Sequence, residues 1–291
     1  MASAAVAVPS RRSVFDASYI RSEFAAVGIS AHFIPLIWKY VLQNPRCGDL
    51  DGVPSLSTAA YALLRQKFRP TTSTLTATAD SKDRTTTKLL IRLQNGESVE
   101  AVIMRYDTRL GKYDGKPRSG GVRSTLCVSS QVGCKMGCRF CATGTMGFKS
   151  NLSSGEIVEQ LVHASRYSQI RNIVFMGMGE PMNNYNALVE AIRVFTESPF
   201  QLSPKRITVS TVVNLIPFNP IGSSSNFKTS SDQNVKKFQK VLRGIYNIRT
   251  TIRQEMGQDI AGACGQLVVS LPDERSAGGA TLLSDIEDLR I

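Results

Sequence analysis

Four cysteines lie close together near the middle of this 291-residue chain, at Cys127, Cys134, Cys138 and Cys141. The last three form a C-x3-C-x2-C run directly after a predicted strand. Three thiolates spaced in this way can bind one face of a [4Fe–4S] cube and leave one iron open. Such an iron can bind S-adenosylmethionine (SAM) and cleave it to a 5′-deoxyadenosyl radical. The alternative is a structural zinc site with Cys127 as the fourth ligand, although zinc sites usually pair two C-x2-C motifs and only one is present here.

The composition indicates a folded, basic protein. Hydrophobic residues make up 42% of the chain, and the formal net charge of +12 favours a polyanionic partner such as RNA or DNA over a merely solubilising surface. Six cysteines are too few for a disulfide scaffold. The sequence contains no run of about 18 apolar residues and therefore predicts no transmembrane helix. We therefore expect no membrane partner, and we also expect a monomer in the cytoplasm, with the chloroplast or mitochondrion as the alternative location.

Strands separated by helices are predicted to hold the cysteine run. Predicted strands at 124–129, 172–176 and 206–211 alternate with helices, one of which begins with a Ser153–Glu156 capping box. This alternation is typical of a parallel α/β sheet or barrel. Upstream, two apolar runs around Asn95-Gly96 predict a β-hairpin.

The chain is accordingly predicted to have five segments. Apolar residues at three- and four-residue spacings indicate a helical module near the N-terminus, which either only packs or also binds RNA. The segments are a flexible N-terminus at 1–13, a helical RNA-binding-like module at 14–70, a linker with the β-hairpin and a basic loop at 71–120, the α/β core at 121–270, and a flexible tail at 271–291.

Several motifs together resemble the RlmN/Cfr-type radical SAM methyltransferases, and in detail the RlmN type. The matching runs are Leu126–Cys134, Phe140-Cys141, Met176–Asn183, Arg206–Thr211, Asn214–Pro220 and Gly257–Leu267. The resemblance implies a radical SAM (β/α) barrel that methylates C2 of an adenine in large-subunit rRNA and in certain tRNAs. It also implies a [4Fe–4S] cluster and SAM as cofactors, and a flavodoxin- or ferredoxin-type reductant as a partner.

The same resemblance implies cofactor-binding roles for seven residues. Gly179 and Glu180 would bind the SAM ammonium group, although a glycine-rich segment is also typical of an ordinary strand-to-loop turn. Ser210 and Asn219 would contact the rest of SAM. The cluster ligands would be Cys134, Cys138 and Cys141.

Three further residues would act on the substrate. By resemblance, Cys264 would accept a methyl group from one SAM, and a radical made from a second SAM would activate that methyl group for addition to the adenine. Cys127 would then resolve the protein–RNA adduct by forming a disulfide with Cys264, and Glu100 would accept a proton. From the residues alone, a lone cysteine such as Cys264 is more often a buried small hydrophobe, and Glu100 can equally lie on a solvated hairpin face. Cys47 matches no functional position.

The sequence departs from the family pattern after Thr211. The family core has six strand–helix units and a Ser-Leu-His segment that helps to bind SAM, whereas here Thr211 is followed at once by Val212-Val213-Asn214. Residues 121–267 span 147 positions, while six units of about 30 residues need about 180. We therefore expect a partial barrel that is shortened by about two strand–helix units.

Three hypotheses for the function follow. The chain is an active rRNA methyltransferase with an open barrel, or it is an internally deleted, catalytically impaired variant that retains Fe–S and RNA binding. The third hypothesis is a zinc-stabilised RNA-binding module.

Overall fold

The computed structural model of the chain describes residues 11–107, 120–138 and 141–209 continuously. Beyond these ranges it describes residues 109 and 260, scattered positions between 231 and 240, and four two-residue strands. These strands are β6 (Lys112–Tyr113), β7 (Lys116–Pro117), β13 (Asn214–Leu215) and β14 (Thr251–Ile252). The predicted tail at 271–291 and several residues in the middle of the predicted basic loop lie outside the described residues.

A small helical module begins the described part of the chain, as the periodicity predicted. Its helices are α1 (Ala17–Ala26), α2 (Ile34–Gln43) and α3 (Thr58–Lys67), and the short strands β1 (Arg12–Ser13) and β2 (Phe68–Arg69) pair in parallel beside them. Helix α2 buries residues spaced three and four apart because these residues share one face of a helix. They are Ile34, Ile37, Trp38 and Val41.

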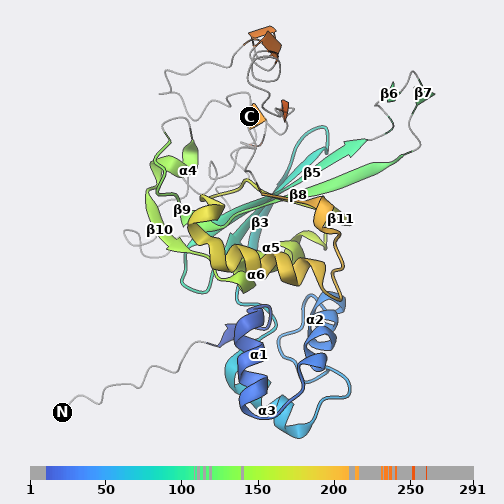
Figure 1. Cartoon of the computed structure of the whole chain (residues 1–291), viewed down its shortest axis with the longest axis vertical. Helices are drawn as coiled ribbons and strands as arrows, with labels where there is room; N and C mark the ends of the chain where they lie inside the picture. The colour runs from blue at the N-terminus through green and yellow to red at the C-terminus, as the bar shows by residue number, and fades with distance from the viewer. Residues whose placement is uncertain are drawn as a thin grey trace, which may run out of the picture.

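A six-stranded mixed sheet lies at the centre of the molecule (Figure 1). Strands β8, β11 and β12 are parallel, as the alternation of strands and helices predicted, while β5, β4 and β3 continue the sheet in antiparallel pairs. In spatial order the strands are β12 (Ile207–Val209), β11 (Ile170–Phe175), β8 (Val122–Val128), β5 (Ser98–Asp107), β4 (Thr86–Arg92) and β3 (Thr74–Asp80).

The predicted hairpin at Asn95-Gly96 is confirmed as β4 and β5. The sequence pattern places this hairpin in a segment apart from the α/β core, whereas β5 pairs directly with β8 of the core. The main sheet therefore runs without a break from the hairpin into the parallel strands.

Two helices cover one face of the sheet. They are α5 (Ser154–Ala164) and α6 (Tyr185–Thr196), and their apolar side chains pack with alternate residues of the strands in the main core. The predicted capping box at α5 is confirmed. The Ser153 hydroxyl accepts a hydrogen bond from the Glu156 N–H at 3.1 Å, and the Glu156 carboxylate accepts one from the Ser153 N–H at 2.8 Å.

The other set of alternate side chains forms a second buried cluster on the opposite face of the sheet, because successive side chains of a strand point to opposite faces. This cluster contains Val102, Cys127 and Val174, with Met104 and Met176 packed against it. We call this side the inner face, because in a barrel with helices outside it would line the interior.

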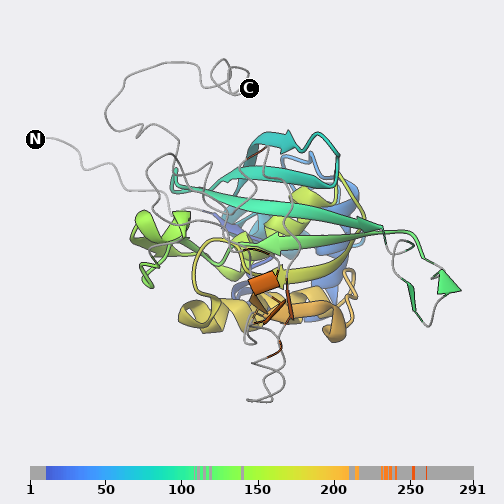
Figure 2. The same ribbon diagram turned by 90° about the horizontal axis from the view of Figure 1, so that it is seen from above.

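The two ends of β8 lead to different structures. Beyond its carboxyl end lie strands β9 (Gln131–Gly133) and β10 (Phe148–Asn151) and the short helix α4 (Ala142–Thr145). Figures 1 and 2 show α4 and the β6–β7 pair at opposite ends of the sheet. Ligands of barrels with this strand–helix order bind at the carboxyl ends of the strands, which is the α4 end here.

The parallel part of the main sheet contains three strands among the described residues. Strand β13 pairs in parallel with β14 in a separate two-stranded sheet. The predicted shortening after Thr211 falls between β12 and β13, at residues 210–213, which lie outside the described residues.

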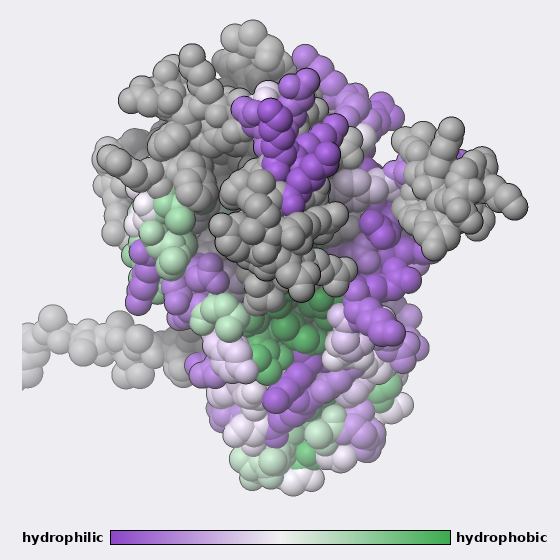
Figure 3. Space-filling model, turned by 45° about the horizontal axis from the view of Figure 1, so that its top comes forward, coloured by the Kyte–Doolittle hydropathy of each residue, from purple (hydrophilic) through white to green (hydrophobic). Residues whose placement is uncertain are grey.

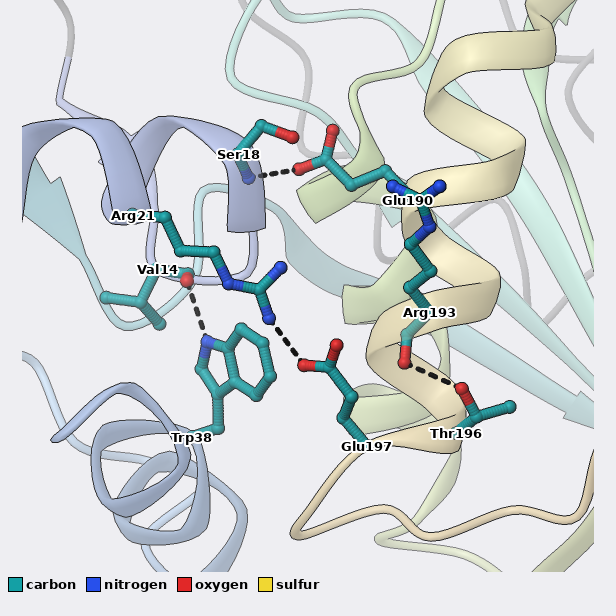
Figure 4. Close-up of polar contacts among 8 residues, drawn as sticks. All are labelled: Val14, Ser18, Arg21, Trp38, Glu190, Arg193, Thr196 and Glu197. Carbon is teal, nitrogen blue, oxygen red and sulfur yellow. Dashed lines mark hydrogen bonds and ion pairs between the residues drawn. The ribbon is translucent and has the colours of Figure 1, made fainter. Parts of the chain in front are cut away.

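The helical module docks against α5 and α6 through polar contacts (Figure 4). The Ser18 N–H donates to Glu190 Oε1 at 2.6 Å, and Arg21 forms an ion pair with Glu197 at 2.5 Å. Asp16 accepts a hydrogen bond from the Gly155 N–H at 2.8 Å, in the first turn of α5. The module therefore lies beside the helices that cover the outer side of the sheet.

The surface of the molecule is mixed in character. Figure 3 shows hydrophobic side chains gathered in the middle of one face and hydrophilic side chains around them. No helix in the described part of the chain is both long and apolar enough to span a membrane. Several exposed large hydrophobic side chains lie on the segments around the cysteine run, namely Met136, Phe148, Met182 and Tyr185.

Candidate functional site

The cysteine run forms a short loop between β9 and α4, which we call the cysteine loop (residues 134–141). The Cys134 N–H donates to the Gly147 carbonyl oxygen at 2.9 Å, which ties the start of the loop to the residue before β10. The Cys141 N–H donates to the Cys138 carbonyl oxygen at 3.0 Å, which closes a turn between the last two cysteines. These backbone bonds keep the three thiols within one compact segment.

The thiols of the cysteine loop are half-buried and influence one another. Burial raises the pKa of the Cys134 thiol, and the nearby Cys141, Cys138 and Glu180 raise it further. A hydrogen bond from the Met136 N–H to Cys134 Sγ, at 3.5 Å, acts in the opposite direction and lowers the pKa. The three thiols and the Glu180 carboxylate therefore share one small region. A metal centre would deprotonate coordinating thiols, so this group of residues fits a cluster held by three thiolates.

A mononuclear zinc site would need its ligands to converge on one point. Within the described ranges, no three His, Cys, Asp or Glu side chains converge closely enough to hold a single metal ion. In a [4Fe–4S] cube each cysteine binds its own iron, so the thiolates need not converge on one point.

A glycine-containing segment after β11, which we call the glycine loop (residues 176–180), packs against the chain that follows β8. Gly179 has a φ of +94°, and a Cβ built on it would lie 2.5 Å from the Gln131 side chain. The next residue, Glu180, donates its N–H to Gln131 Oε1 at 2.8 Å. The close approach requires glycine at 179, and it holds Glu180 near the cysteine loop.

Ser129 connects the glycine loop to the hairpin. Its hydroxyl accepts a hydrogen bond from the Met178 N–H at 2.9 Å and donates one to the Glu100 carbonyl oxygen at 2.6 Å. The Gln160 side chain pairs with both backbone groups of Ser129, at 2.8 and 2.9 Å. The position of Glu100 along the sheet is therefore fixed relative to the glycine loop.

Glu100 and Cys127 lie on the same inner face of the sheet. Val102, two residues from Glu100, is paired in register with Cys127 on β8 and with Lys88 on β4. The Glu100 carboxylate is fully buried and forms an ion pair with the Lys88 ammonium at 2.9 Å. The sequence left open whether Glu100 lies on a solvated hairpin face, and the full burial of its side chain excludes that alternative.

The remaining candidate residues are placed less completely. Ser210, Asn219 and Cys264 lie outside the described residues, so the predicted SAM contacts and the predicted disulfide between Cys127 and Cys264 stay predictions. Cys47 is half-buried and packs against the main core, away from the inner face.

Three polar residues of the site were missed from the sequence. Lys88 could have been found, because the hairpin register pairs Leu90 with Glu100 and so places positions 88 and 100 on one face of the sheet. Ser129 and Gln131 carry no local signal, because their partners come from distant segments.

This fold and site define a radical SAM protein, and comparisons with known proteins agree. The family model described as the Radical SAM superfamily matches residues 128–219, which include the cysteine and glycine loops. A solved radical SAM methyltransferase from Sphaerobacter thermophilus superposes with a TM-score of 0.69 at 26% identity, covering 88% of this chain and 98% of its own.

Curated relatives give the particular family. The chain is 30% identical over 336 aligned positions to the ribosomal RNA large subunit methyltransferase N of Nitrosopumilus maritimus, covering 80% of this chain and 90% of the relative. It is 31% identical to the dual-specificity RNA methyltransferase RlmN of Halorhodospira halophila, over 79% of this chain and 85% of the relative. The chain belongs to the RlmN family of methyltransferases, whose members use a [4Fe–4S] cluster and SAM.

Proposed function

We propose that this chain transfers a methyl group from SAM to C2 of an adenine in large-subunit rRNA, and also in tRNA, through a methylated Cys264. One observation carries the proposal. The cysteine loop, the glycine loop and the Glu100 and Cys127 side chains meet at the carboxyl ends of β8 and β11 and on the inner face beside them. The rRNA and dual-specificity RNA methyltransferases among the relatives support RNA as the substrate.

The proposed roles follow from where the residues lie. Cys134, Cys138 and Cys141 would hold the cluster, and Glu180 would bind the SAM ammonium group beside it. Cluster and SAM together supply the radical when bound. Further along the inner face, Cys127 would resolve the adduct with RNA and Glu100 would accept a proton.

Two partners fit the surface. The net charge of +12 suits the phosphate backbone of RNA, because basic proteins are attracted to polyanions. Exposed apolar side chains beside the cysteine loop, namely Met136, Phe148, Met182 and Tyr185, suit a flavodoxin- or ferredoxin-type reductant, since an electron must enter near the cluster.

A second candidate is an internally deleted variant that binds the cluster and RNA but turns over poorly. The alignment with the relative from Nitrosopumilus maritimus runs over 336 positions yet covers 80% of a 291-residue chain. It must therefore include many positions where the relative has residues and this chain has none. This gap agrees with the predicted loss of about two strand–helix units after Thr211.

Anaerobic reconstitution with iron and sulfide tests both candidates. The measurements are iron and zinc per chain, release of 5′-deoxyadenosine from SAM, and 2-methyladenine in rRNA and tRNA by mass spectrometry. We expect iron to be lost in Cys138→Ser and kept in the matched control Cys47→Ser. Iron with SAM cleavage and methylated RNA supports the active enzyme, whereas iron without SAM cleavage supports the impaired variant. Zinc alone would contradict both.

A further inference from the structure

Several arginine side chains lie at one end of the main sheet. This is the end away from the cysteine loop, where β5 ends and β8 and β11 begin (Figures 1 and 2). The Arg105 N–H donates to the Thr85 carbonyl oxygen at 2.7 Å, and Arg105 is paired in register with Ser124 of β8. Ser124 is paired in turn with Ile170 of β11. The arginines at or next to these positions are therefore neighbours across the sheet.

We call these side chains the arginine row, and each comes from a different segment. Its members are Arg84 in the β3–β4 turn, Arg105 in β5, Arg123 in β8, Arg171 in β11 and Arg206 directly before β12. Neighbouring strands lie about 4.8 Å apart, so the row from β4 to β12 is about 20 Å wide. Arg123 shares the inner face with Cys127, whereas Arg105 shares the other face with Ile103 of the main core. The row therefore surrounds this end of the sheet on both faces.

The positive charge of the row is not compensated within the described part of the chain. Its four exposed members form no ion pair with any described carboxylate. In contrast, several basic side chains of the helical module and one beside the hairpin are paired with acids at 2.5–2.9 Å. The carboxylates closest in sequence to the row, Asp83 and Asp107, accept hydrogen bonds from other neighbours, which include Ser81, Thr85 and Arg109.

Two members of the row are held in place by the sheet itself. Arg105 Nη1 donates to Thr87 Oγ1 at 2.8 Å and to the Arg84 carbonyl oxygen at 3.3 Å. Arg123 Nε lies 3.3 Å from the side-chain amide of Asn172, whose oxygen accepts the hydrogen bond. These contacts use one or two of the five donors of each guanidinium group. The row is therefore ordered and still offers donors to an outside acceptor.

The chemistry of the row fits phosphate groups. A guanidinium is a planar fork of donors that matches phosphate oxygens, and it keeps its charge at any physiological pH. A row of such groups about 20 Å wide suits a polyanion better than a single small anion. Strand β5 has ten residues and is about 30 Å long, so the row lies about that far from the site at the other end of the sheet.

We propose that the arginine row is a second RNA-contact surface, which binds phosphates of the large-subunit rRNA about 30 Å from the adenine that is methylated. These contacts add affinity and orient the RNA, and they read no base sequence. The β6–β7 pair lies beyond the row, and its strands contain Lys112 and Lys116, which add to the positive charge. This inference rests on the proposed function, because it assigns a further contact to the same substrate.

Filter binding with a full-length transcript of large-subunit rRNA tests the proposal without any turnover. In the triple variant Arg84→Gln/Arg123→Gln/Arg171→Gln, affinity at 0.1 M salt should fall by about 10- to 100-fold. The slope of log K against log salt concentration should become shallower by about 2–3, because each lost phosphate contact removes about 0.7–0.9. Urea unfolding checks the fold. If the triple variant does not fold, Arg171→Gln replaces it, with an expected change in slope of about 0.7–0.9.

A matched control removes the same charge elsewhere on the surface. The triple variant Arg21→Gln/Arg65→Gln/Arg193→Gln takes its arginines from the helical module and α6 and should keep most of the affinity. Equal losses in the two triple variants would show that only the overall charge matters, and would overturn the proposal. So would unchanged rRNA binding in the row variant, including the case in which that variant loses binding to vesicles that contain phosphatidylserine.

The length of the RNA gives the second test, in the reconstituted chain. In the row variant the KM for the long transcript should rise by about 10-fold or more, with kcat nearly unchanged. A short hairpin that carries only the target adenine and its closing stem cannot reach both ends of the sheet, so its KM should not change. An equal rise in KM for the hairpin would place the row at the chemical site and refute a separate surface.

The outcomes keep the two proposals apart. If the wild-type chain releases no 5′-deoxyadenosine from SAM, the proposed function fails, and the binding measurements alone decide the role of the arginine row. If the chain methylates RNA but its affinity for the long transcript does not depend on the row, the proposed function stands and this inference fails.

Discussion

Replacing Gly133 with alanine is expected to separate β10 from β9 and so weaken the cysteine loop. Gly133 has a φ of +69°, and a Cβ built there would lie 1.8 Å from the carbonyl oxygen of Gly147. An L-residue in the left-handed region costs about 1–2 kcal/mol. Moving Gly147 away also breaks its 2.9 Å hydrogen bond from the Cys134 N–H, which is worth about 1 kcal/mol. We therefore expect the free energy of unfolding to fall by about 2–3 kcal/mol.

Gly147 provides a matched control in the same strand pair. Its φ is +67°, but a Cβ there would meet no atom within 4 Å. Gly147→Ala should therefore cost only the backbone term of about 1–2 kcal/mol. Urea unfolding gives the free energies, and iron per chain after reconstitution reports on the cysteine loop. Gly133→Ala should lose most of its iron, and Gly147→Ala should keep it. Equal losses of stability and iron in the two variants would refute the reasoning.

Three further predictions concern α5 and the helical module. Burial raises the pKa of Glu156 to about 7 and lowers that of His163 to about 4. Stability from protonated Glu156 is lost as the pH rises towards 7, whereas stability from neutral His163 is lost as the pH falls from about 6.5 to 4, so the two effects oppose each other. Glu156→Gln removes the first of these effects, so between pH 4 and 6.5 the free energy of unfolding should rise by up to about 3 kcal/mol more than it does in the wild-type chain; identical profiles for the two chains in urea titrations at several pH values would contradict this. Arg21→Ala should lower the free energy of unfolding by less than about 1 kcal/mol, because its ion pair with Glu197 is on the surface. A loss several times larger in thermal unfolding would contradict this weak contribution of the ion pair. Trp38→Ala should cost about 3–5 kcal/mol, since this side chain is fully buried, and a loss close to that of Arg21→Ala would be the contrary result.

Local features of the fold could be predicted from the sequence. The capping box needs only Ser153 and Glu156, three residues apart, and the hairpin needs only the apolar runs around Asn95-Gly96. The three cysteines of the cysteine loop are likewise close in sequence. In each case the chain pattern itself contains the interacting partners.

Contacts between distant segments could not be predicted in this way. Nothing in the hairpin sequence indicates that β5 pairs with β8. Strands pair through backbone N–H and C=O groups, and these groups are alike in all strands. For the same reason the sequence left open whether Glu100 is buried or solvated. Alternation along a strand tells which residues share a face, but it does not tell which face the rest of the chain covers. The hydrogen bond from Gly155 to Asp16 is a further example, since it joins segments 139 residues apart.

The buried Trp38 gives the chain an optical property. It is the single tryptophan of the sequence, and its Nε1 donates to the Val14 carbonyl oxygen at 2.8 Å within the helical module (Figure 4). Tryptophan fluorescence therefore reports on the packing around the helical module, whereas the visible absorbance of a loaded cluster would report on the cysteine loop. Denaturation curves recorded with both signals would coincide if the chain unfolds as one cooperative unit, and would separate if the module detaches before the sheet opens.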